Sequence, residues 1–163
     1  MIILKRNKFL FHNGAKYSCL IGKNGIRRLK KEGDWCTPTG KFTLGPVYYR
    51  KDKINRLETR LKCFTIKKNM CWEDNPNSKN YNSLSISNRK SNEMLYRKDN
   101  IYDIIIVINY NTKPVTPGYG SAIFIHIAKN SFLPTKGCIA LKKKDLVSLI
   151  KKLKLTDKLL VTF

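Results

Sequence analysis

Two residues in the last third of the sequence have the types and spacing of a nucleophile and its base. His126 ends an apolar segment, and a Gly-Cys pair, Gly137 and Cys138, follows a short loop. A cysteine reacts as its thiolate, and an imidazole within hydrogen-bond reach is the usual group that removes the thiol proton. Gly137 would let the backbone turn tightly, so that main-chain amides around it face an oxyanion. The pattern predicts covalent chemistry at a carbonyl carbon, with Cys138 as nucleophile and His126 as base.

Each of these residues also has a purely structural interpretation. A histidine among aliphatic residues is often a satisfied core side chain, and a buried cysteine is often inert. His12, the only other histidine, precedes an Asn-Gly dipeptide and is expected to be exposed. The combination of histidine, spacing and Gly-Cys turn favours the catalytic interpretation of His126 and Cys138.

The elements around this pair are expected to be mainly strands. Residues 101–110 are β-branched and nearly all apolar, which is typical of a central strand buried on both faces. Residues 121–128 form the next expected strand, in which His126 shares a face with the even-numbered positions. Apolar residues at helical spacing predict an amphipathic helix over 142–155, and residues 158–163 are expected to form the last strand.

The rest of the chain predicts short strands and loops. Strands at 8–12 and 15–21 flank Asn13-Gly14, a strong hairpin signal. Residues 48–97 show little periodicity and are expected to be mostly loops, either a lid or binding loop or an insertion without a task, with a short helix capped near Ser91. The fold class expected is therefore mainly β, a β-rich mixed sheet or sandwich with a few short helices, one of them near the C-terminus.

Length and composition predict one domain over residues 1–163. A chain of this length with 42% hydrophobic residues can build a proper core. The first residues alternate apolar and basic side chains and show no secretory signal, so a cytoplasmic protein is expected, or a periplasmic one if the chain is a trimmed mature form. The longest apolar run, 104–108, is far too short to span a bilayer. A monomer is expected.

The cysteine count and the charge carry weaker information about partners. Five cysteines without CxxC spacing predict neither a disulfide framework nor a metal site, and no cofactor is implied. The net charge of +22 and a pI near 10.0 make nucleic acid a candidate ligand. The basic residues are spread along the chain without a recognition motif, which favours a solvated basic surface and disfavours nucleic acid as the main ligand.

Several motifs in order along the chain resemble those of one family. These are Thr37-Pro38-Thr39-Gly40-Lys41-Phe42, then Trp72, Asp74, Pro76 and Tyr81-Asn82, and finally His126 followed by Thr135-Lys136-Gly137-Cys138-Ile139. Their order over nearly the whole chain resembles a compact branch of the L,D-transpeptidase catalytic domain family, the YkuD type.

The resemblance implies an activity on the stem peptides of peptidoglycan. Cys138 would attack the carbonyl between an L-centre and a D-amino acid, with His126 as general base and the amides around Gly137 and Cys138 as oxyanion hole. Thr135 would support the loop, and Thr135, Lys136, Tyr81, Asn82 and Trp72 would contact substrate. The acyl-enzyme would pass to an amine in an L,D-transpeptidase, or to water in a cytoplasmic L,D-carboxypeptidase that hydrolyses recycled tetrapeptides. A non-catalytic basic module that binds nucleic acid or wall polymer is the remaining alternative.

The sequence departs from the family pattern on both sides of the nucleophile. Typical members have a His before the Gly-Cys pair and an Arg or Asn soon after it, whereas this chain has Lys136, Ala140 and Leu141. Lys136 would either place a positive charge beside the thiolate or substrate carboxylate, or be an exposed loop lysine. The group that orients His126 would be a backbone carbonyl or a residue that the sequence does not locate.

Overall fold

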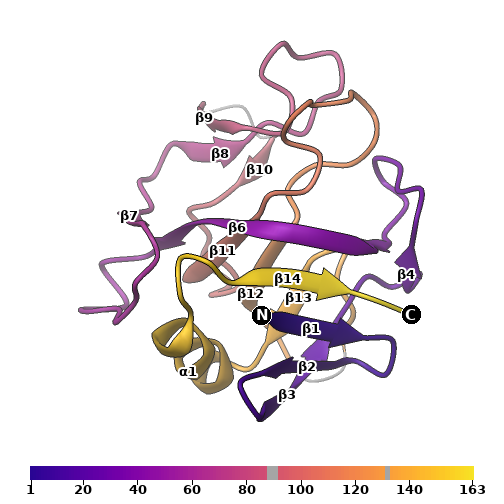
Figure 1. Cartoon of the computed structure of the whole chain (residues 1–163). Coiled ribbons are helices and arrows are strands. Elements are labelled where there is room, and N and C mark those ends of the chain that lie inside the picture. Colours follow the sequence, from indigo (N-terminus) through magenta and orange to yellow (C-terminus); the bar gives the residue numbers. More distant parts are fainter. Residues whose placement is uncertain (88–91, 131–132) are drawn as a thin grey trace.

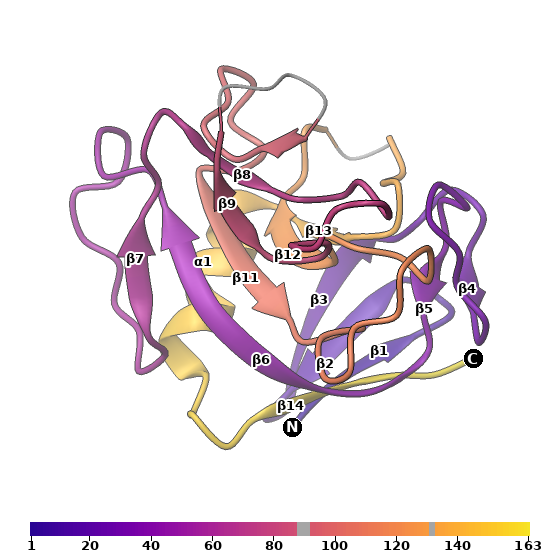
Figure 2. The same cartoon turned by 90° about the horizontal axis from the view of Figure 1, so that it is seen from above.

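The computed structural model describes residues 1–87, 92–130 and 133–163, and its largest element is one mixed β-sheet. The nine strands of this sheet follow the order β11-β12-β13-β3-β2-β1-β14-β6-β7. Strand β6 also pairs with β11, so the sheet closes on itself like a barrel, as the ring of strands in Figure 2 shows. The bounds are β1 (Ile2–Lys5), β2 (Phe9–His12), β3 (Ala15–Leu20), β6 (Gly40–Tyr49), β7 (Cys63–Thr65), β11 (Ile104–Ile108), β12 (Phe124–Ile127), β13 (Ile139–Leu141) and β14 (Lys158–Val161).

Two small sheets and one helix complete the described part of the chain. The small sheets contain β4 (Ile26–Arg27) with β5 (Thr37–Pro38), and β8 (Met70–Trp72) between β9 (Leu84–Ile86) and β10 (Glu93–Met94). The helix α1 (Lys143–Lys152) buries Leu146, Leu149 and Ile150. Figure 1 shows α1 and the β8–β10 sheet on opposite sides of the large sheet. The mainly β fold class is confirmed.

The central strand β11 is buried on both faces because it lies between two apolar clusters. Ile104, Ile106 and Ile108 point into the cluster that also contains the buried face of α1. Ile105 and Val107 point into a second cluster that includes residues of β8. An uninterrupted β-branched segment is what such a strand requires, and the sequence prediction for it is confirmed.

The hairpin predicted at Asn13-Gly14 is also confirmed. Strands β2 and β3 pair antiparallel with His12 opposite Ala15. Asn13 and Gly14 have φ angles of 47° and 78°, the left-handed conformation that both central residues of a type I′ turn need.

The expectation of a few short helices is wrong. The described residues contain one α-helix, not a few, because Glu93 and Met94 pair with Trp72 and Cys71 as strand β10, and a short helix there would be unstable without packing. Ser91, the expected cap, lies outside the described residues. The described part of residues 48–97 is mostly loops, as expected, and its four short strands, β7 to β10, pair with β6 or with one another.

His12 is buried rather than exposed. Its Nε2 lies 3.0 Å from Oδ2 of Asp157, which precedes β14. The pKa of the Asp157 carboxyl is lowered to about 2. Burial acts to raise this pKa, but the hydrogen bonds that the carboxylate accepts, including the one from His12, together have the larger effect. This pair links the end of β2 to the start of β14, the two strands that flank β1, and takes His12 out of consideration as a catalytic residue.

Within the described ranges, no helix has the length and apolar character needed to cross a membrane.

Candidate active site

The pairing of β12 with β13 places His126 and Cys138 on one face of the sheet. These strands are parallel, with Ile125 opposite Ile139 and His126 opposite Ala140. Side chains alternate along a strand, so Ile125 and Ile139 point into the core together. His126 and Ala140 point to the other face, and Cys138, which directly precedes β13, points there too. The register thus brings together two residues that are twelve positions apart.

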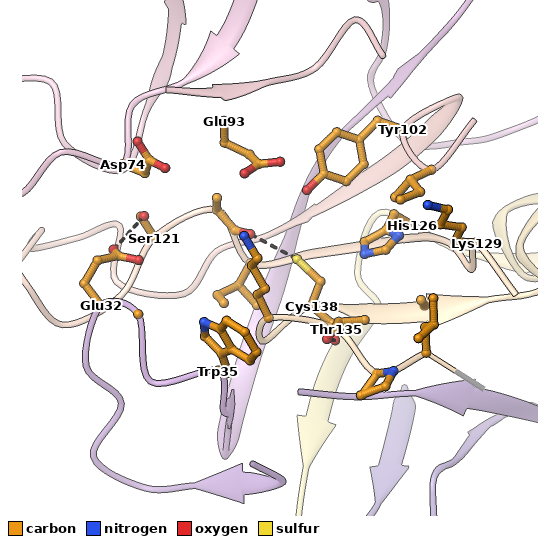
Figure 3. A pocket seen from close by; sticks show the side chains of 18 of the residues that line it. Glu32, Trp35, Asp74, Glu93, Tyr102, Ser121, His126, Lys129, Thr135 and Cys138 are labelled. Atoms are coloured by element: carbon orange, nitrogen blue, oxygen red, sulfur yellow. Dashed lines mark hydrogen bonds between the residues drawn. The ribbon is translucent and has the colours of Figure 1, made fainter. Parts of the chain in front are cut away.

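Both side chains line one cavity of about 480 Å³. Figure 3 shows Cys138 near its centre and the His126 ring beside Tyr102 and Lys129. The small side chain of Ala140 also lines the cavity, at the position opposite His126. Carboxylates and cations meet across this space: it is lined by Glu32, Asp74 and Glu93, and by Lys30, Arg97, Lys129 and Lys136. The cavity can therefore hold a substrate that carries both charges.

The thiol of Cys138 is held by the backbone next to β12. It donates a hydrogen bond to the Ala122 carbonyl at 3.2 Å, and its sulfur accepts one from the Phe124 amide at 3.4 Å. Burial raises the pKa of this thiol to about 12; the Phe124 amide and Lys30 oppose the rise, and Glu93 adds to it. In the free protein the residue is accordingly a neutral thiol.

The imidazole of His126 has the orientation of a base. Its Nδ1 lies 2.8 Å from the Ile127 carbonyl, and because a carbonyl only accepts, Nδ1 carries the proton and Nε2 is the basic atom. The Tyr102 ring packs edge-on against it, with 5.3 Å between centroids. Burial lowers the pKa of His126 to about 4, so the ring is neutral and able to accept a proton at neutral pH. A backbone carbonyl is thus the group that orients this histidine.

The Gly-Cys turn is fixed by two threonines. The Thr135 hydroxyl donates to the Cys138 carbonyl at 2.6 Å and accepts from the Gly137 amide at 3.1 Å. The Thr37 hydroxyl donates to the Gly137 carbonyl at 2.9 Å. Because the Gly137 amide is already bonded, the expectation that it faces an oxyanion does not hold in this state, and the amide of Cys138 is the better candidate. Thr135 has the supporting position expected for it.

The expected substrate-contacting residues separate into two groups. Thr135 and Lys136 line the cavity, whereas Trp72, Tyr81 and Asn82 are buried behind it. The Asn82 side chain accepts from the Trp72 indole at 2.9 Å and from the Ala122 amide at 3.1 Å. These residues hold the segment whose Ala122 carbonyl binds the thiol. A direct contact of the three with substrate stays a prediction.

The Tyr81 hydroxyl supports the same segment from another side. It accepts from the Gly120 amide at 3.1 Å and donates to the Glu32 carboxylate, which also accepts from Ser121 at 2.7 Å. Figure 3 shows the bond between Ser121 and Glu32 at the edge of the cavity. Glu32 therefore couples the 30s loop to the strand that carries His126.

Sequence reasoning missed the charged and aromatic residues that complete the cavity. Glu93 comes from a region interpreted as loops, Tyr102 from the expected central strand over 101–110, and Lys30 from a basic stretch interpreted as solvated surface. The one local signal was the i, i+4 spacing of Lys30 and Asp34, which form an ion pair. Among the described residues, no three His, Cys, Asp or Glu side chains gather as metal ligands.

Replacing Gly137 with alanine should both destabilise the protein and stop catalysis. Gly137 has a φ of +138°, and a Cβ there would lie 2.8 Å from the Cys36 carbonyl oxygen. Strain of this kind costs on the order of 1–3 kcal/mol, and relieving it would displace Cys138. Thermal unfolding and turnover measure the two effects. The matched control is Gly14→Ala, which has a φ of +78° but no neighbour within 4 Å: it should lower Tm and leave turnover unchanged.

Comparison with known proteins finds a matching family and similar solved structures. The sequence model of the family described as L,D-transpeptidase catalytic domain (YkuD) matches residues 1–161. Two crystal structures of the helical cell shape determining protein Pgp2 from Campylobacter jejuni are similar, at 14% identity and a TM-score of 0.47 for one, and 15% and 0.46 for the other, a mutant. Each covers 98% of this chain, which spans only 46% and 45% of theirs. No curated protein sequence matches the chain.

Proposed function

Because the chain belongs to the L,D-transpeptidase catalytic domain family, we propose that it catalyses cysteine-dependent acyl transfer on peptidoglycan stem peptides. The substrate bond is the peptide bond between an L-centre and a D-amino acid, and the D-amino acid leaves. The observation that carries this proposal is the placement of Cys138 and His126 on one face of the parallel β12–β13 pair, inside one cavity.

In the first half-reaction, the Cys138 sulfur adds to the scissile carbonyl carbon. His126 Nε2 takes the thiol proton, and the carbonyl π electrons move to oxygen, where the Cys138 amide is the proposed donor. Collapse of this intermediate breaks the C–N bond, and His126 returns the proton to the leaving amine. The products are a thioester on Cys138 and a free D-amino acid.

The state of the two groups before reaction supports proton transfer coupled to attack. The pKa of Cys138 is about 12 and that of His126 about 4, so thiol and imidazole are both neutral. An ion pair formed in advance would require these two pKa values in the reverse order. Substrate binding removes water from the cavity, and the proton then moves as the sulfur attacks the carbonyl carbon.

The charges lining the cavity favour an amine as acyl acceptor. Asp74 and Glu93 face the cavity in Figure 3. Burial, with smaller contributions from Glu93 and Glu32, raises the pKa of Asp74 to about 6. Asp74 therefore lies near other carboxylates that repel its negative charge, and a protonated amine on the substrate would reduce this repulsion. We therefore place transpeptidation first, with L,D-carboxypeptidase activity, in which water takes the acyl group, as the alternative.

Product masses distinguish the two reactions. The protein is incubated with a disaccharide tetrapeptide and, separately, with a carbapenem as acylating probe, and intact protein and products are analysed by mass spectrometry. Transpeptidation gives a cross-linked dimer, and hydrolysis gives the tripeptide and a free D-amino acid. Without adduct or product in either incubation, the enzymatic proposal would be abandoned for binding of wall polymer or nucleic acid by the basic surface.

A further inference from the structure

Lys30 is a charged residue inside the cavity whose burial the catalytic pair does not explain. It lies in the loop between β4 and β5, is only 2% exposed, and lines the cavity that contains Cys138. Burying an ammonium group is costly unless it is paired and hydrogen-bonded. The structure must therefore supply partners for this charge.

The ammonium group of Lys30 has a fixed position. Its Nζ donates to Oδ1 of Asp34 at 2.7 Å and to the Lys31 carbonyl at 3.3 Å. Asp34 is itself held by the amides of Lys31 at 2.8 Å and Cys36 at 2.9 Å. The lysine stem lies against Gly120, where a Cβ would approach its Cε to 2.8 Å. Both ends of the side chain are thus constrained.

This fixed charge lies against the Gly-Cys turn. A Cβ on Gly137 would be 3.5 Å from Lys30 Nζ, and Gly137 directly precedes the nucleophile. At such a separation in a partly dry cavity, a positive charge favours a neighbouring anion over its neutral acid. The charge of Lys30 acts in this direction on Cys138, against the effect of burial.

The other lysine near the turn is neither buried nor, among the described residues, paired as Lys30 is. Lys136, which the sequence suggested as the cation beside the thiolate, is exposed, and its Nζ lies 6.0 Å from the centroid of the Trp35 ring. A solvated charge on a flexible stem has a weaker effect on a buried sulfur. Lys30 is therefore the better candidate for that role.

We propose that Lys30 is the positioning cation of this active site: its ammonium group stabilises Cys138 in the ionised, nucleophilic form, and Asp34 holds the ammonium in place while offsetting part of its charge. The step is the loss of the thiol proton to His126 Nε2, with the electron pair staying on sulfur. The inference rests on the proposed function for its purpose, but the ionisation of Cys138 can be measured without any substrate.

Other titratable groups also face the sulfur. His126 and Tyr102 lie beside it, and Glu93 opposes ionisation from β10. Further charges line the same cavity at Glu32, Asp74, Arg97, Lys129 and Lys136. All of them stay in place in the variants below, so a change in the reactivity of Cys138 reports on the Lys30–Asp34 pair.

The test measures the alkylation rate of Cys138 by iodoacetamide between pH 7 and 10 in the full chain, by mass spectrometry of the peptide that contains Cys138. Lys30→Met should slow alkylation about tenfold or more at a fixed pH, because a neighbouring opposite charge shifts a pKa by about one or more. Asp34→Asn keeps the shape of the partner but leaves the ammonium uncompensated, so alkylation should become several-fold faster.

The opposite signs separate an electrostatic role from a structural one. Both substitutions break the same ion pair, so a purely structural role would change the rate in the same direction in both variants, and that result would overturn the proposal. Should Lys30→Met fail to fold, Asp34→Asn decides alone: an unchanged or slower rate contradicts the proposal. Because no stem peptide is used, failure of the product assay with these alkylation shifts present would reject the substrate and leave the role of Lys30 standing.

Discussion

Replacing Cys138 with alanine should abolish both the covalent adduct and the release of product. The sulfur is the only atom in the proposed mechanism that forms a bond to the substrate, and the acyl-enzyme cannot exist without it. We expect turnover to fall on the order of 10⁴-fold or more, because removing a nucleophile removes the whole covalent pathway. Cys138→Ser should be similarly inactive, since a serine hydroxyl is a far weaker nucleophile beside a base with a pKa of about 4.

The matched control for this prediction is Cys63→Ala. Cys63 is a half-buried free cysteine on β7, outside the cavity, so its removal should leave adduct and turnover unchanged. Intact-protein mass spectrometry with the carbapenem probe measures the adduct directly. An adduct that persists in Cys138→Ala, or one that disappears in Cys63→Ala, would show that the nucleophile has been assigned to the wrong cysteine.

The parts of the fold that the sequence predicted correctly are those determined by local patterns. Asn13-Gly14 specifies a turn by its own conformational preference, and the apolar periodicity before residue 153 specifies α1. By contrast, β7 to β10 have two or three residues each and depend on pairing with β6 or with one another. Segments of two or three residues are too short to show an apolar periodicity, so their strands could not be predicted within residues 48–97.

The residues of the candidate site also divide into those that a local motif predicts and those that it does not. His126 and Cys138 were found because one motif within thirteen residues contains both, and a single parallel register then sets them on one face. Lys30, Glu93 and Tyr102 are separated from this motif by about two dozen residues or more, and the tertiary fold brings them to the cavity. A lysine, a glutamate and a tyrosine are common residue types, and no local motif marks these three as part of a site.

The hydrogen bonds of the Gly-Cys turn could not be predicted from the sequence either. Two amides near the nucleophile were expected to face an oxyanion, but the Thr135 hydroxyl binds the Gly137 amide. A threonine two residues before a glycine signals a local turn, yet its bond to that particular amide depends on the backbone conformation of Gly137. The oxyanion site therefore has to be sought at the Cys138 amide.

Replacing His126 with glutamine should lower turnover by about 10²- to 10⁴-fold without unfolding the protein, because glutamine cannot accept the thiol proton. In the wild-type protein, His126 must be neutral to act, and burial lowers its pKa to about 4. The acid limb of the rate profile should therefore fall as the pH drops through about 4, rather than near the ordinary value for histidine. The limb should be absent in His126→Gln, whose residual rate should rise with pH as the Cys138 thiol ionises.

The control for His126→Gln is His12→Gln, which removes the other histidine of the chain. His12 is buried against Asp157 and does not line the cavity, so His12→Gln should lower Tm but leave the turnover number and the acid limb of the folded protein unchanged. This contrast separates loss of a base from loss of stability. An acid limb near pH 6.5 in the wild-type protein would mean that the imidazole is solvated when it reacts. A limb that persists in His126→Gln would assign the proton acceptor to another group, and the neutral thiol–imidazole pair would no longer describe the starting state of the reaction.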